Sequence, residues 1–131
     1  MRQLFIASLL VFASFGVTAA QAQNASTQQE IPNMGRAPRE ADGVGRLDLR
    51  VVDANGNPVE GVRADLKSKR SNGFECESWN WTDARGVSVL PPLHMGRLQL
   101  TLKAKGYETL KLNVNAADLD QPLRVTMVRK K

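Results

Sequence analysis

The sequence predicts an all-β domain built as a sandwich of seven strands. Short runs between residues 47 and 127 alternate apolar and polar side chains, and turn-forming residues separate these runs. No segment has the 3.6-residue period of an amphipathic helix. A period of two places alternate side chains on opposite sides of a strand, so each run offers one apolar face. Two sheets that pack these faces against each other form a sandwich.

Seven segments account for the strands. Five alternate clearly: LDLRVV (47–52), VRADL (62–66), LQLTLKA (98–104), LKLNV (110–114) and LRVTM (123–127). The segment FECESWNW (74–81) adds another strand. The seventh segment begins at Gly86 and ends in a corner near Pro91-Pro92. The separators DANGNP (53–58), TDARG (82–86) and KGY (105–107) have turn chemistry, and NAADLD (115–120) has room for one helical turn.

The first 44 residues predict export followed by a flexible arm. A short basic start precedes a charge-free apolar run over residues 4–17, and small residues up to Ala22 suit a signal peptidase. The run is shorter than the roughly 20 residues of a spanning helix, so we expect a cleaved signal peptide (1–22) and no membrane span. Residues 23–44 contain few large apolar groups, which predicts a flexible arm. Residues 45–131 then form the domain of a periplasmic or secreted protein.

Charge and cysteine content exclude little and identify no partner. The net charge of +5 permits attraction to anionic surfaces. Nucleic acid is disfavoured, because aromatic side chains are not interleaved with the basic ones. Cys76 is the only cysteine, so no internal disulfide can form even in an oxidising compartment. We expect Cys76 to be a small buried hydrophobic residue; an intermolecular disulfide stays open if it is exposed.

Two stretches resemble the carboxypeptidase regulatory-like domain, a transthyretin-like (prealbumin-like) family. DANGNPVEGVRADL (53–66) contains the pattern G-x-P-hydrophobic-x-G-hydrophobic, and TDARGVSVLPPLHMGRLQLTLKAKGY (82–107) carries the later family positions. These positions are Thr82-Asp83, Gly86, Leu90, Leu93, Gly96 and Gly106-Tyr107. The resemblance covers about residues 45–129. It implies a seven-stranded Greek-key sandwich that serves as an accessory module and is not an enzyme.

The chain departs from the family pattern at two positions. Ser88 stands where the family usually has an aromatic residue, and Leu98 where it usually has Tyr. A serine there leaves core volume unfilled, which costs stability. Trp79 or Trp81 on the preceding strand could fill the gap, so we favour a core or sheet-edge position for both. An outward position would make them a platform for a sugar ring or an apolar peptide, with Glu75 and Glu77 beside them as hydrogen-bond acceptors.

Other candidate sites have weaker support. Lys103, Lys105 and Lys111 fall on the polar sides of neighbouring strands, and Arg129, Lys130 and Lys131 follow at the end of the chain. These residues can protect a solvated face, or they can form a basic patch for anionic envelope polymers or lipid head groups. The Asp53, Asn55, Asn57 loop resembles a calcium loop but lacks the distal acid. His94 is the single histidine, so we expect no zinc site, no catalytic triad and no cofactor.

The sequence therefore predicts an exported, non-enzymatic module of the bacterial envelope or secretome. Its partner would be a protein, bound through an edge strand or the loops. The alternative is an envelope glycan bound through Trp79 and Trp81.

Overall fold

The computed structural model describes residues 30–131, and Pro32–Lys131 form one compact unit. The signal peptide predicted over residues 1–22 lies outside the described residues. So do residues 23–29 of the predicted arm.

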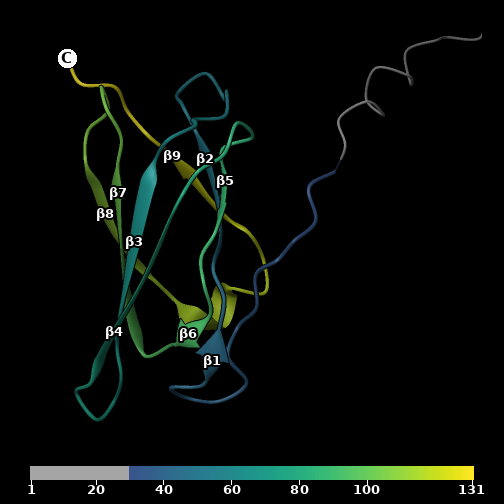
Figure 1. Cartoon of the computed structure of the whole chain (residues 1–131), viewed down its shortest axis with the longest axis vertical. Helices are drawn as coiled ribbons and strands as arrows, with labels where there is room; N and C mark the ends of the chain where they lie inside the picture. Colours follow the sequence, from purple (N-terminus) through teal and green to yellow (C-terminus); the bar gives the residue numbers. More distant parts are fainter. Residues whose placement is uncertain (1–29) are drawn as a thin grey trace, which may run out of the picture. The chain divides into compact units, whose positions relative to one another are not determined.

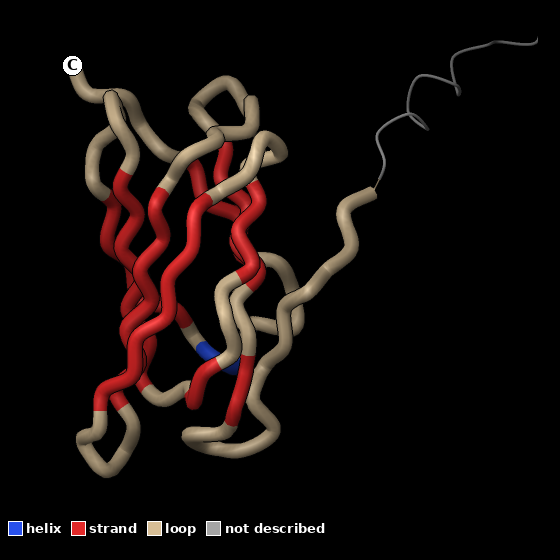
Figure 2. Tube along the Cα trace, viewed as in Figure 1, coloured by secondary structure: helices blue, strands red, loops and turns tan. Residues whose placement is uncertain are grey.

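The described chain is all-β, and its strands form two main sheets and a short pair. The four-stranded antiparallel sheet has the order β4 (Glu75–Trp81), β3 (Arg63–Lys69), β7 (Arg97–Lys103), β8 (Leu110–Val114). The three-stranded sheet has the order β5 (Val87–Val89), β2 (Asp48–Val52), β9 (Leu123–Thr126). The pair consists of β1 (Val44–Gly45) and β6 (Leu93–His94). Figures 1 and 2 show the two main sheets as separate layers.

The seven predicted strand segments are all present, and their apolar faces form the core. Side chains from both sheets are fully buried there, including Leu49 and Val51 from β2 and Leu66, Leu100 and Leu102 from the four-stranded sheet. The alternation seen in the sequence therefore predicted the buried face correctly. The two-residue strands β1 and β6 are too short to show an alternating pattern, and the sequence did not predict them.

The turns match their predicted chemistry. Gly56, Gly86 and Gly106 all have positive φ angles, as the turn sequences require. Gly86 is the most constrained, because a Cβ at this position would collide with the carbonyl oxygen of Val51. The single helical turn expected within residues 115–120 is a 3-10 turn, η2 (Ala116–Asp118), capped by the side chain of Asn115.

One strand pairing differs from expectation. Sandwiches of short strands are ordinarily antiparallel, but β9 pairs with β2 in parallel, with Val125 opposite Val51. After β8 the chain passes through η2 and crosses to the other sheet, where β9 lies beside β2. Alternation within a strand sets which face is buried and carries no information on the direction of its neighbour.

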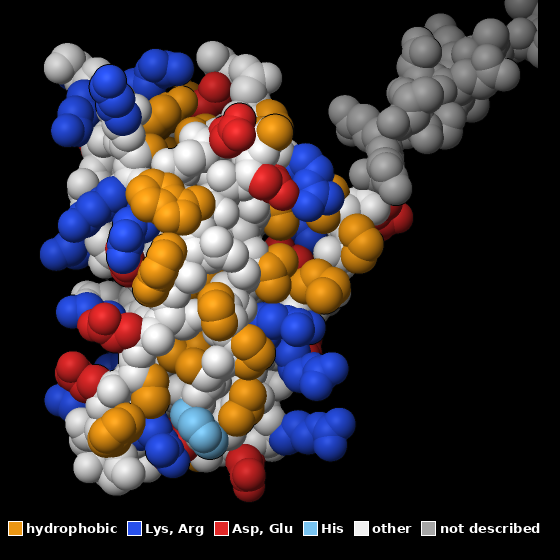
Figure 3. Space-filling model, in the orientation of Figure 1, with side chains coloured by type: hydrophobic (Ala, Val, Ile, Leu, Met, Phe, Trp, Pro, Cys, Tyr) orange, Lys and Arg blue, Asp and Glu red, His pale blue; other side chains and the backbone are white. Residues whose placement is uncertain are grey.

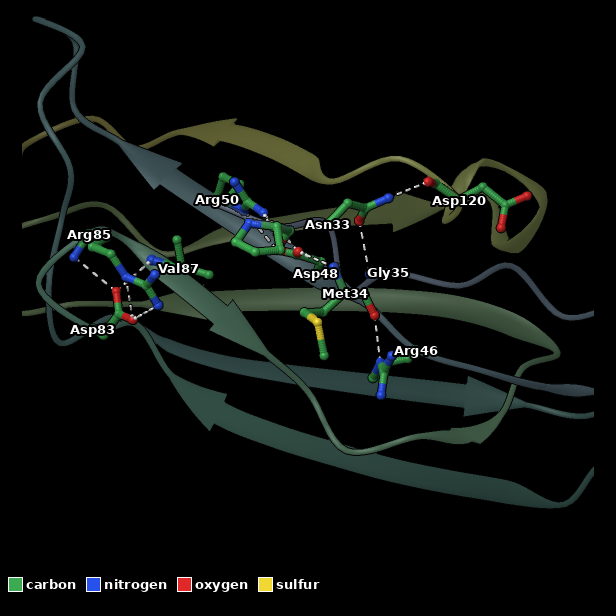
Figure 4. Close-up of polar contacts among 11 residues, drawn as sticks. Asn33, Met34, Gly35, Arg46, Asp48, Arg50, Asp83, Arg85, Val87 and Asp120 are labelled. Atoms are coloured by element: carbon green, nitrogen blue, oxygen red, sulfur yellow. Dashed lines mark hydrogen bonds and ion pairs between the residues drawn. The ribbon is translucent and has the colours of Figure 1, made fainter. Parts of the chain in front are cut away.

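Residues 32–44, predicted as part of a flexible arm, instead pack on the three-stranded sheet. The amide of Met34 donates to Asp48 Oδ2 (2.9 Å), and the amide of Ala37 donates to Asp120 Oδ1 (3.0 Å). Arg36 and Arg46 exchange two backbone hydrogen bonds of 2.9 Å. The segment has few apolar side chains to bury, and its polar backbone groups find partners at distant acids (Figure 4). A pattern of hydrophobic residues cannot reveal that kind of attachment.

This segment also covers an ion pair on the second face of β2. Asp48 and Arg50 alternate with the core leucines, yet their side chains are 0% and 9% exposed. Arg50 Nε lies 2.8 Å from Asp48 Oδ1, and Arg50 Nη2 donates to the Pro32 carbonyl (3.1 Å). Burial alone would raise the pKa of Asp48, but hydrogen bonds from Arg50 and the Met34 amide outweigh it and hold the pKa below its ordinary value.

Candidate functional site

The most distinctive surface is the outer face of the four-stranded sheet. Paired residues of neighbouring strands point to the same side, so the odd-numbered residues of β4, β3, β7 and β8 share this face. Its rows run across the sheet: Trp81, Arg63, Lys103; then Trp79, Asp65, Thr101, Lys111; then Glu77, Lys67, Gln99, Asn113; then Glu75, Lys69, Arg97. Apart from the two tryptophans, every side chain in these rows is polar or charged.

Trp79 and Trp81 lie on this outer face, which corrects the inward or edge-covering position favoured from the sequence. Their exposed fractions are 52% and 50%. The volume next to Ser88 is not filled by either indole, because polar residues of β4 point inward instead. Ser78 Oγ donates to the Pro91 carbonyl and Asn80 Nδ2 to the Val89 carbonyl, both at 2.9 Å. These bonds attach β4 to the segment that leads out of β5.

Arg63 holds the two tryptophans in one arrangement. Its guanidinium carbon lies 4.7 Å from the ring centre of Trp79 and 5.7 Å from that of Trp81. Arg63 Nε donates to both oxygens of Asp65, at 3.2 and 3.1 Å. The acid thereby orients the guanidinium between the rings, where cation–π attraction acts on both. We call Trp79, Trp81, Arg63 and Asp65 the aromatic platform.

Glu75 and Glu77 lie on the same face as the tryptophans, as expected for an outward position. Glu77 is two residues from Trp79 and forms an exposed ion pair of 3.6 Å with Lys67. Glu75 lies further from the aromatic platform, at the hairpin end of β4. Of the two acids, Glu77 alone is adjacent to an indole along the strand.

Two of the candidate lysines, Lys103 and Lys111, share this face, and Lys105 lies in the turn after β7. Lys103 and Lys105 line a cavity of about 430 Å³ together with Arg63, Trp81 and Lys130. Lys111 lies opposite Thr101 and outside that lining. We call this cavity the basic pocket; sequence reasoning missed Arg63. In the space-filling view, exposed hydrophobic side chains adjoin Lys and Arg side chains on this side of the molecule (Figure 3).

The remaining sequence candidates serve as structural contacts. Asp53 Oδ1 accepts the amides of Asn55 and Asn57, both at 2.9 Å, so the loop that resembles a calcium loop is a hydrogen-bonded turn. The pKa of Asp53 lies below its ordinary value, and the hydrogen bond from the Asn57 amide is the main cause. His94 Nδ1 lies 2.9 Å from the carbonyl oxygen of Asp42, where it holds the 38–43 loop. Cys76 is half-buried on the inner side of β4.

Two general findings apply to the part of the chain that the structure describes. Within residues 30–131, no three His, Cys, Asp or Glu side chains gather as they would to hold a metal ion. No helix in that range has the length and apolar character needed to cross a membrane.

Comparison with known proteins informs the fold and leaves the activity open. No protein-family model matches the chain, and no curated protein does. Among solved structures, the chain is similar to the crystal structure of 3-chlorocatechol 1,2-dioxygenase from Rhodococcus opacus 1CP, with a TM-score of 0.51 and 14% identity. The match covers 74% of this chain and spans only 64% of the dioxygenase chain. At that identity the likeness concerns the fold alone.

Proposed function

We propose that this chain is an exported, non-catalytic binding module that recognises a glycan at the aromatic platform. The observation that carries the proposal is the outward position of Trp79 and Trp81, with Arg63 stacked against both. Exposed indoles forfeit the stability they would add in a core, so their position favours a role in contact with a ligand. The module has the Greek-key, transthyretin-like architecture implied by the family resemblance, and the periplasm or the cell exterior is its compartment.

The chemistry of the surrounding face supports a sugar over a protein partner. The centre of a stable protein interface is depleted in charged side chains. Here the two indoles are surrounded by Asp65, Glu77, Lys67 and Lys103. A sugar ring matches this arrangement, since its C–H groups pack on an indole face while its hydroxyls exchange hydrogen bonds with carboxylates and amines.

The non-catalytic part of the proposal rests on what the polar residues already do. His94 is bonded to the Asp42 carbonyl, and Thr82 and Ser78 bond backbone carbonyls inside the fold. Each of these side chains is occupied by a contact that holds the fold, which supports a binding role over a catalytic one. Similarity of fold to a dioxygenase does not transfer its chemistry, because one fold hosts many activities.

Intrinsic fluorescence provides a direct test, because Trp79 and Trp81 are the only tryptophans in the chain. Titration with a panel of envelope and capsular polysaccharides is expected to shift the emission, and Trp79→Ala and Trp81→Ala are expected to abolish binding measured by calorimetry. Phe74→Ala is the matched control, since Phe74 is 61% exposed but lies outside the platform. An emission spectrum that no polysaccharide changes would contradict the proposal.

A second candidate, a protein partner, is favoured by one observation. Strand β8 is the last strand of its sheet, and no described strand pairs with its outer edge. Such an edge can accept an extended segment of another protein. Asn113→Pro, which removes a backbone donor from β8, should then abolish capture of that partner, whereas Trp79→Ala should leave it intact.

A further inference from the structure

The basic pocket adjoins the aromatic platform through two shared residues. Arg63 and Trp81 belong to both. The rest of the lining comes from three places in the chain: Gly61 before β3, the end of β7 and the turn after it (Lys103, Ala104, Lys105, Tyr107 and Thr109), and Lys130 near the C-terminus. A ligand stacked on Trp81 therefore reaches the pocket without leaving the surface of the sheet.

Backbone hydrogen bonds hold the lysines of the pocket together. The amide of Lys130 donates to the carbonyl of Gly106 (2.9 Å), and the amide of Glu108 donates to the carbonyl of Val128 (2.8 Å). Arg129 is stacked over the ring of Tyr107, with its guanidinium carbon 5.0 Å from the ring centre. These contacts hold the C-terminal segment beside the turn after β7, so Lys130 and Lys105 line the same recess.

The charge of the lining is of one sign. The pocket contains Arg63, Lys103, Lys105 and Lys130, and no Asp or Glu is among its lining residues. Within residues 30–131, neither Lys103, Lys105 nor Lys130 forms an ion pair with an acid. Arg63 uses its Nε for Asp65, and the described residues give its two terminal nitrogens no hydrogen-bond partner. Those terminal nitrogens suit the planar, two-oxygen geometry of a carboxylate.

We propose that the natural ligand is an acidic glycan, a sugar polymer with carboxylate groups, whose ring stacks on Trp81 while its carboxylate enters the basic pocket. This inference rests on the proposed function, because it assigns a ligand class to the same face. Charge complementarity carries it: the recess next to the sugar-stacking surface gathers three lysines that no acid of the described residues pairs, together with Arg63, whose terminal nitrogens have no hydrogen-bond partner there. A neutral glycan would leave that charge uncompensated.

The test compares two forms of one polymer, polygalacturonate and its fully methyl-esterified form, by calorimetry with the full chain. Both present the same rings, but only the first has free carboxylates. Polygalacturonate should bind about tenfold more tightly, and the preference should fall as salt is raised from about 50 to about 200 mM. Lys103→Ala and Lys105→Ala should each reduce the ratio of the two affinities, polygalacturonate over its ester, about threefold to fivefold. Lys69→Ala is the matched control, since Lys69 is exposed on the same face, in the row furthest from the tryptophans, and does not line the pocket.

The outcomes separate this inference from the proposed function. Equal affinity for the two polymers, with both lost in Trp81→Ala, would overturn the acidic ligand while leaving glycan binding in place. No binding to either form would overturn the acidic ligand, and the wider polysaccharide panel would then decide on glycan binding. The protein could also bind phosphatidylglycerol vesicles more tightly than polygalacturonate. If Lys103→Ala weakened both interactions to the same extent, the pocket would be assigned to a membrane surface instead. Circular dichroism of each variant checks that the sandwich is retained.

Discussion

The guanidinium of Arg63 lies 4.7 Å from the centre of the Trp79 ring, although the residue directly opposite Trp79 on β3 is Asp65. The Arg63 side chain therefore leans diagonally across the sheet, guided by its bonds to Asp65. This lean places one cation between two indoles. It gives the outer face a defined shape before any ligand arrives, which reduces the ordering cost of binding.

Replacing Arg63 should loosen the aromatic platform more than it destabilises the fold. We expect Arg63→Ala to lower the free energy of unfolding by about 1 kcal/mol, because the cation–π contacts are partly exposed. Tryptophan fluorescence anisotropy should fall at the same time, as the indoles gain rotational freedom. Arg97→Ala is the control, since Arg97 lies on the same face without a ring contact in the described chain. Unchanged anisotropy in Arg63→Ala would show that Arg63 does not restrain the rings.

The buried pair of Asp48 and Arg50 should be sensitive to loss of one partner. Asp48→Asn leaves the guanidinium of Arg50 buried without its counter-charge, so we expect a loss of about 3 kcal/mol in urea denaturation at neutral pH. The double change Asp48→Leu with Arg50→Leu should recover part of that loss, because no charge stays buried. Glu77→Gln, in an exposed pair, should change stability by less than about 0.5 kcal/mol.

Stability should depend on pH through the carboxyl of Asp48. Its folded-state pKa is lowered below the ordinary 3.8, so the ionised form is favoured by folding. The stabilisation is complete above the ordinary pKa and is lost as the pH falls from there through the folded-state value. Urea midpoints measured between neutral pH and about pH 2 should decline in this window, and the decline should be smaller in Asp48→Asn. Equal declines in the two proteins would assign the acid sensitivity to other carboxyls.

Thr82 should stabilise the fold through its hydroxyl. Its Oγ1 accepts the Val62 amide (2.9 Å) and donates to the Val59 carbonyl (2.7 Å), and the residue is 4% exposed. Thr82→Val preserves the shape but leaves these two buried groups unpaired, so we expect a loss of about 2 kcal/mol in thermal or chemical unfolding. Thr82→Ser, which keeps the hydroxyl, should lose much less. Similar losses in both variants would attribute the effect to packing of the methyl group.

Much of the fold could be predicted because the relevant signals are local. Leu49, Leu66 and Leu100 alternate with polar neighbours, and all three are buried. Gly86 and Gly106 mark turns whose positive φ angles other residues rarely adopt. The candidate residues Trp79 and Trp81 could also be found, since two indoles at a spacing of two must share one side of a strand.

The orientation of those residues could not be predicted. In β4 the side chains on both sides of the strand include large or polar groups, so alternation offers no contrast between inside and outside. The strand is oriented by Ser78 and Asn80, whose inward hydrogen bonds are made to residues on a different segment. Lys130 likewise joins the basic pocket through a bond to Gly106, a residue far away in the chain.

Local alternation and turn chemistry thus decide which segments are strands, where they end and which side chains form the core, because each depends on neighbours a few residues apart. The packed structure decides the parallel pairing of β9, the cover of residues 32–44 over Asp48 and Arg50, and the outward platform of Trp79 and Trp81. Each of these depends on what lies opposite in space. Hydrogen bonds between residues far apart in the sequence determine which groups lie opposite each other, and such bonds produce no periodic pattern along the chain.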